Sequence, residues 1–224
     1  MIKALLMDLD NTLLDFDKCE EYALIPVLKK YGIEANEDNK KYYSKINLSY
    51  WKRLEKKEIT REQVITLRWE EFFSHFGLKE NGKEINKMYF NRLKEGGYPL
   101  EGALEFLKAA SKKYKIYIVS NGMKEVQENR IKVSGIRPYL DKIYISQELG
   151  MVKPDKEFFD YVLNDINLNR EECLVIGDSL TSDIQGAINS SIPYILFDRY
   201  DKNRDFNGPR CTKLDDLMNV INNL

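Results

Sequence analysis

Five short apolar runs recur along this chain, and amphipathic segments separate most of them. The runs are Ile2–Met7, Ile116–Val119, Lys142–Ile145, Cys173–Ile176 and Tyr194–Phe197. Because strands buried on both faces read as short continuous apolar runs, this pattern predicts a parallel sheet with helices over each face. We therefore expect an α/β fold with a Rossmann-like core.

The helices of this core are expected where apolar residues recur at helical spacing. A polar, loop-like stretch is expected at residues 198–211, and a short helix at the carboxyl end of the chain. The expected helices are Glu101–Lys113, Lys124–Val133, Asp155–Asn167, Ser182–Asn189 and Lys213–Leu224.

A long block near the amino terminus breaks the alternation of strands and helices. It has no convincing strand and shows three helical patterns, the clearest of which begins with the capping box Thr60-Arg61-Glu62-Gln63. Because this block follows the first apolar run, we predict an all-helical cap domain at residues 16–96. It is inserted into an α/β core formed by residues 1–15 and 97–224, and we expect it to close over the ends of the strands.

The net charge and the cysteines of the chain limit which partners and which cellular compartment we expect for it. The chain has 35 Lys and Arg against 36 Asp and Glu, for a formal net charge of -1. This balance argues against a nucleic-acid polymer as partner. The cysteines Cys19, Cys173 and Cys211 lack metal-type spacing. From the residues of the chain we expect neither a secretory leader nor a membrane-spanning run. We expect a cytoplasmic monomer or small homo-oligomer with no membrane partner.

Four polar clusters occur in order along the chain, three of them directly after an apolar run. Open parallel sheets bind ligands at the carboxyl ends of their strands, so we expect the clusters to meet there. Alone, each cluster is a common turn or helix cap, but all four in this order indicate a site. The clusters are Asp8-Leu9-Asp10-Asn11-Thr12, Ser120-Asn121-Gly122, Lys153-Pro154-Asp155 and Gly177-Asp178-Ser179-Leu180-Thr181-Ser182-Asp183.

These clusters contain the groups that phosphoryl transfer requires: a nucleophile, a proton donor and positive charge around anionic oxygens. Asp8 is the candidate nucleophile, and Asp10 can protonate the leaving oxygen and later deprotonate water. Further donors are the hydroxyls of Thr12 and Ser120 and the ammonium of Lys153. The turn amides near Asn121 and Gly122 complete the expected substrate-binding set.

The carboxylates also predict a metal. Asp8 and Asp178 form a hard, oxygen-rich site suited to Mg²⁺, which would offset repulsion between carboxylate and phosphate. Asp183 is expected either to hold Lys153 in place or to support the metal from outside the ligand set.

The four clusters resemble the four motifs of the haloacid dehalogenase (HAD) superfamily over essentially the whole chain, and the helical insertion resembles its type I cap. The resemblance implies Mg²⁺ held by Asp8, Asp178 and the backbone carbonyl of Asp10, and the roles given above. Haloacid dehalogenases of this superfamily lack the second carboxylate, so Asp10 favours phosphate chemistry. No lysine here can be assigned the Schiff-base role of the phosphonate hydrolases.

The insertion suggests a substrate. Its segments Asn47–Trp51 and Leu54–Gln63 resemble the branch that contains pyrimidine 5′-nucleotidases, which implies a nucleoside monophosphate. The aromatic-rich segment Tyr42–Lys52 can stack on a base or form the core of the insertion. Three alternatives stay open: a small sugar or glycolate phosphatase, a phosphomutase, and an idle binding domain on the same scaffold.

Overall fold

The computed structural model describes all 224 residues, which form two compact units. The core unit consists of Met1–Phe16 and Gly97–Leu224, and the helical unit consists of Asp17–Gly96. No helix is both long enough and apolar enough to span a membrane.

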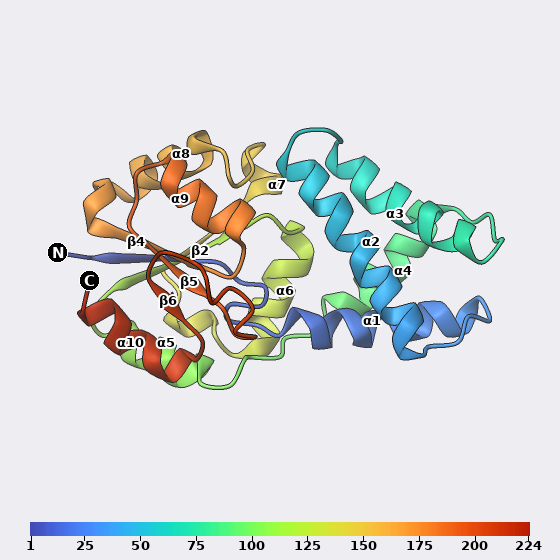
Figure 1. Ribbon diagram of the computed structural model, residues 1–224, viewed down its shortest axis with the longest axis horizontal. Helices are drawn as coiled ribbons and strands as arrows, with labels where there is room; N and C mark the ends of the chain where they lie inside the picture. The colour runs from blue at the N-terminus through green and yellow to red at the C-terminus, as the bar shows by residue number, and fades with distance from the viewer. The chain divides into compact units, whose positions relative to one another are not determined.

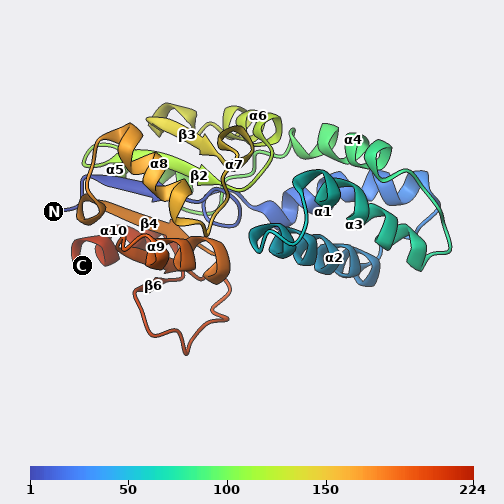
Figure 2. The same cartoon turned by 90° about the horizontal axis from the view of Figure 1, so that it is seen from above.

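The core unit contains a six-stranded parallel sheet in the order β3-β2-β1-β4-β5-β6 (Figure 2). The five apolar runs all form strands, which confirms the predicted α/β class. In register, Leu5 of the central strand lies opposite Ile116 on one side and Leu174 on the other. The strands are β1 (Ala4–Met7), β2 (Lys115–Ser120), β3 (Lys142–Ile145), β4 (Cys173–Gly177), β5 (Tyr194–Phe197) and β6 (Arg210–Cys211).

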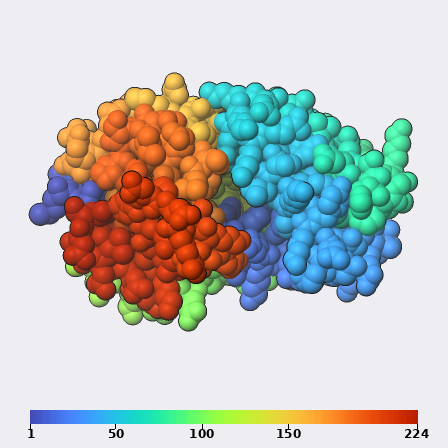
Figure 3. Space-filling view, viewed as in Figure 1, coloured from blue at the N-terminus to red at the C-terminus, as the bar shows by residue number.

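Helices cover both faces of this sheet (Figure 1). Alternate residues of β1 point to opposite faces, so Leu5 packs with α5 and α10 while Leu6 packs with α8 and α9. In the space-filling view the C-terminal segment, orange to red, covers much of the visible face of the core unit (Figure 3). The core helices are α5 (Ala103–Ala110), α6 (Lys124–Ser134), α7 (Ser146–Leu149), α8 (Lys156–Ile166), α9 (Gln185–Asn189) and α10 (Leu214–Asn222).

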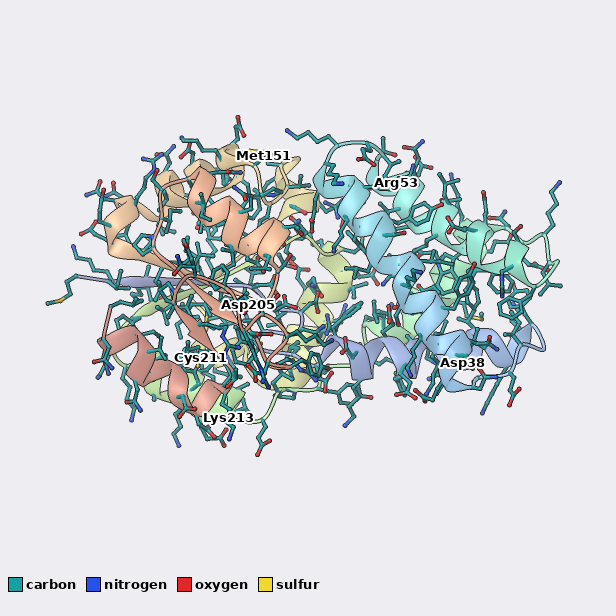
Figure 4. The ribbon with its side chains drawn as sticks, viewed as in Figure 1. Asp38, Arg53, Met151, Asp205, Cys211 and Lys213 are labelled. Carbon is teal, nitrogen blue, oxygen red and sulfur yellow. The ribbon has the colours of Figure 1, made fainter.

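Two expectations for the core unit hold in outline and differ from the structure in detail. The stretch expected to be loop contains β6, a two-residue edge strand held by bonds such as Asp198 N–H to the Cys211 carbonyl at 2.8 Å. Such a strand is too short to leave a periodic pattern. Figure 4 shows Cys211 and Lys213 near each other just after the loop that carries Asp205.

The helix expected at Ser182–Asn189 begins earlier and is not uniform. A π-helical turn, Leu180–Ile184, precedes α9, and the Ser179 side chain caps it by accepting from the Ser182 amide. Because this wide turn directs Asp183 inward, it contributes directly to the site described below.

The helical unit contains four helices rather than the three expected patterns. α3 begins after the predicted capping box, in which Thr60 and Gln63 bond reciprocally. Stacked rings of Tyr43 and Trp69, with centroids 4.4 Å apart, lie in the interior, so Tyr43 belongs to the core of this unit. The helices are α1 (Phe16–Lys30), whose first residue belongs to the core unit, α2 (Glu37–Glu55), α3 (Arg61–His75) and α4 (Gly82–Leu93).

Candidate active site

The first cluster leaves the central strand of the sheet. Asp8 directly follows β1, and its backbone N–H donates to the carbonyl of Ile176 in β4 at 2.8 Å. This bond extends the sheet by one residue and fixes the backbone from which the side chain projects. The Thr12 hydroxyl donates to Asp8 Oδ2 at 3.3 Å and closes the loop upon itself.

Lys153 brings the third cluster to the first. Its ammonium donates to Asp8 Oδ1 at 2.8 Å, to Asp183 Oδ1 at 2.6 Å and to the Val119 carbonyl at 2.7 Å. Burial would lower the pKa of Lys153, but the charges of Asp183 and Asp8 outweigh that effect and raise it above its ordinary value. Lys153 therefore stays charged although only 1% of its surface is exposed.

Asp8 is a buried carboxylate in a crowded acidic site. Burial raises the pKa of Asp8 to about 7; the Lys153 ammonium opposes this rise, and the charges of Asp183 and Asp10 add to it. The carboxylate is therefore poised between its charged and neutral forms near neutral pH when no cation is bound.

Three carboxylates form a group that could hold a metal ion. Oxygens of Asp8, Asp178 and Asp183 all lie within 4.8 Å of one another. Burial, followed by the charges of Asp8 and Asp183, raises the pKa of Asp178 well above its ordinary value. Three carboxylates facing one ammonium are short of positive charge, and a set of hard oxygen donors fits Mg²⁺.

The predicted ligands were Asp8, Asp10 and Asp178, with Asp183 outside the set. The geometry groups Asp183 with Asp8 and Asp178, although Asp183 also accepts from Lys153 and from the Ser179 amide at 3.1 Å. The side chain of Asp10 instead faces α6. Its expected contribution through the backbone carbonyl stays a prediction.

The Asp10 carboxylate is held by two side chains that the sequence analysis missed. Arg130 forms an ion pair with Asp10 Oδ1, and Gln127 Nε2 donates to Asp10 Oδ2 at 2.6 Å. Both residues come from the buried face of α6 and are at most 1% exposed. The only sequence signal was a pair of polar residues, three apart, on the inward face of a predicted helix.

The second cluster, Ser120-Asn121-Gly122, hydrogen-bonds to the loop that carries Lys153. The Asn121 side-chain amide donates to the Lys153 carbonyl at 2.8 Å and accepts from the Lys153 amide at 2.9 Å. The Gly122 N–H donates to the Ser120 hydroxyl at 3.1 Å. The Asn121 side chain thus positions the loop of Lys153, whereas phosphate binding by Ser120 and by the backbone of Asn121 and Gly122 stays a prediction.

The sequence of this chain is similar to those of known hydrolases. The family model described as haloacid dehalogenase-like hydrolase matches residues 5–197. The chain is 38% identical to pyrimidine 5′-nucleotidase PynA of Streptococcus pneumoniae, covering 87% of this chain and 83% of that protein. It is 33% identical to pyrimidine 5′-nucleotidase YjjG of Escherichia coli, covering 83% of this chain and 81% of that protein.

Solved structures show the same architecture. The crystal structure of the putative HAD-hydrolase YfnB from Bacillus subtilis, bound to magnesium, matches with a TM-score of 0.93 and 30% identity over 99% of both chains. L-2-haloacid dehalogenase from Xanthobacter autotrophicus shares the fold, with a TM-score of 0.80 at 16% identity over the full length of both chains.

Proposed function

The chain belongs to the haloacid dehalogenase-like hydrolases, and from that premise we propose that it is a magnesium-dependent phosphomonoesterase that acts through an aspartyl-phosphate on Asp8. The observation that carries the proposal is the buried pair of Asp8 and Lys153, with a second carboxylate, Asp10, two residues further on. A nucleophile next to a fixed ammonium and a separate acid are what phosphoryl transfer needs.

In the first step, an oxygen of Asp8 attacks phosphorus and the bond from phosphorus to the ester oxygen breaks. Asp10 gives its proton to the departing alkoxide, so the alcohol leaves neutral. Lys153, Thr12 and Ser120 place positive charge and hydroxyl donors around the phosphoryl oxygens.

In the second step, water attacks the aspartyl-phosphate. Asp10, now a carboxylate, takes a proton from that water, the bond between Asp8 and phosphorus breaks, and inorganic phosphate leaves. We propose that Asp8, Asp178 and the backbone carbonyl of Asp10 hold Mg²⁺, with Asp183 beside them. When bound, the ion supplies positive charge against the phosphoryl oxygens and the grouped carboxylates.

We further propose that the substrate is a pyrimidine nucleoside 5′-monophosphate. The names of PynA and YjjG, at 38% and 33% identity, support this choice. The presence of Asp10 favours it over dehalogenation, because an alkoxide leaving group needs a proton and a halide does not. Residues 16–96 are proposed to form the cap domain that chooses among phosphate esters, and residues 1–15 and 97–224 the catalytic domain.

The test is phosphate release from a panel of nucleoside monophosphates and sugar phosphates, with Mg²⁺ or with chelator, for the unaltered protein and for Asp8→Asn. We expect Mg²⁺-dependent release that is fastest on pyrimidine monophosphates and lost in Asp8→Asn. Release confined to sugar phosphates would overturn the proposal that the protein is a nucleotidase. A requirement for a bisphosphate would replace the hydrolase by a mutase, and release that survives in Asp8→Asn would overturn the mechanism.

A further inference from the structure

We propose that Arg130 and Gln127 are positioning residues that hold Asp10 in the orientation in which it exchanges its proton with the leaving group and with water. The inference rests on the proposed function, because it gives two α6 side chains a part in the work assigned to Asp10. It concerns residues outside the four motifs.

The contacts around Asp10 fix its carboxyl group from one side. Arg130 pairs with Oδ1, Gln127 donates to Oδ2 at 2.6 Å, and Arg130 Nη1 donates to Gln127 Oε1 at 2.9 Å. A carboxylate gripped at both oxygens by donors that also bond each other has little rotational freedom. The Asp10 side chain is nevertheless 30% exposed, whereas that of Arg130 is 0% exposed, so Asp10 keeps an open side for a reactant.

The burial of Arg130 is evidence that its ion pair with Asp10 has a function. A guanidinium removed from water is tolerated when it is paired and hydrogen-bonded, and the carboxylate that pairs with this one is Asp10. The Arg130 guanidinium also lies over the Phe16 ring, 5.5 Å from its centroid. Being on a regular helix rather than on a loop, Arg130 offers Asp10 a rigid support.

Gln127 extends the support to the second cluster. Its Nε2 donates to the Ser120 hydroxyl at 2.9 Å as well as to Asp10, so one amide group links the proposed acid to a proposed phosphate ligand. A Cβ at Gly122 would lie 2.5 Å from this same nitrogen. Glycine at 122 therefore leaves room for Gln127, a requirement separate from any contact of its backbone with phosphate.

If Asp10 is poorly positioned, the rate at which the aspartyl-phosphate forms should depend on the leaving group of the substrate. A nucleoside alkoxide needs the proton of Asp10 to depart, whereas p-nitrophenolate is stable enough to leave without it. Loss of Arg130 should therefore slow formation of the aspartyl-phosphate from a nucleoside monophosphate, and spare its formation from p-nitrophenyl phosphate. Hydrolysis of the intermediate, which needs Asp10 as base, should slow with either substrate.

The experiment compares Arg130→Met, Arg130→Lys and Gln127→Met with the unaltered full-length protein in Mg²⁺, with Lys132→Met as control. Lys132 is an exposed cation on the same helix with no part in the site.

For Arg130→Met we expect turnover of pyrimidine monophosphates to fall about 10²-fold. With p-nitrophenyl phosphate we expect a rapid burst of one p-nitrophenolate per active site before a slow steady state. Arg130→Lys should recover part of the loss, Gln127→Met should lose about tenfold, and Lys132→Met should change little.

Equal losses on both substrates without a burst, in variants with unchanged circular dichroism, would overturn the positioning role, as would unchanged turnover in Arg130→Met. If Arg130→Met does not fold, the burst in Gln127→Met and Arg130→Lys decides the matter. Failure of the proposed function looks different, because the unaltered protein would then release no phosphate or Asp8→Asn would stay active.

Discussion

At the residue scale, the acidic cluster makes the metal-free protein sensitive to pH. Burial raises the pKa of Asp8 to about 7 and that of Asp178 well above its ordinary value. A carboxyl group whose pKa is higher folded than unfolded destabilises the fold when ionised. For Asp8 this cost is absent below the ordinary value of 3.8, grows as the pH rises and is complete above about 7.

We therefore expect the melting temperature, measured in chelator, to fall as the pH rises from about 5 to about 8. Asp178→Asn removes one of the repelling charges. It should raise the free energy of unfolding at the upper end of that range by on the order of 1 kcal/mol and flatten the pH profile. Asp205→Asn, at an exposed position, is the control. A lower melting temperature for Asp178→Asn in chelator would contradict this account.

Lys153 presents the opposite case, a buried cation that two carboxylates require. Lys153→Met would leave Asp8 and Asp183 facing each other without their shared ammonium. We expect phosphatase activity to disappear and the free energy of unfolding to drop by about 3 kcal/mol, measured by urea denaturation.

The control for Lys153 is Lys156→Met. Lys156 lies three residues further on, and its ion pair with Asp160 joins side chains that are 49% and 32% exposed. Such a pair contributes at most about 1 kcal/mol. Similar losses in the two lysine variants would mean that the buried ammonium is not needed.

At the element scale, α3 and α4 approach each other through a glycine. A Cβ at Gly82, the first residue of α4, would lie 2.2 Å from the backbone carbonyl oxygen of Thr66 in α3. Since backbone atoms cannot move aside as a flexible side chain can, Gly82→Ala should separate the helices. We expect a loss of about 1–3 kcal/mol in the free energy of unfolding.

The neighbouring residue provides the comparison for Gly82. Lys83→Ala removes an exposed side chain whose partner, Glu62, is also exposed. Calorimetry should show a clear drop in melting temperature for Gly82→Ala and almost none for Lys83→Ala. Equal melting temperatures would show that the two helices can separate at little cost.

The elements also show how far sequence reasoning reaches. Runs such as Cys173–Ile176 were predictable because each strand carries its own apolar signal, and the capping box at Thr60 is equally local. The two-residue strand β6 has no such signal. The pair of Arg130 and Asp10 joins residues 120 positions apart, so it depends on how α6 packs and could not be predicted from spacing.

At the scale of the whole molecule, the hydrophobic core of the core unit does not depend on residues of the helical unit. Its two hydrophobic clusters draw on residues from Ala4–Leu14 and from beyond Gly97, and none comes from residues 17–96. The two ends of the insertion are already joined inside the core unit. The Asp15 N–H donates to the Tyr98 carbonyl at 2.8 Å, and the Leu100 N–H donates to the Leu13 carbonyl at 2.9 Å.

This arrangement predicts that residues 17–96 can be removed. If Phe16 is joined to Gly97 by a short Gly-Ser linker, the remaining chain should unfold cooperatively and keep the circular dichroism of an α/β protein. It should also hydrolyse p-nitrophenyl phosphate slowly, because Asp8, Asp10, Lys153 and Asp178 all belong to the core unit. As the control, deletion of residues 1–16 removes the central strand β1, which pairs with both β2 and β4, and should abolish folding. An excised chain that behaves like this control would mean that the core unit depends on the helical unit after all.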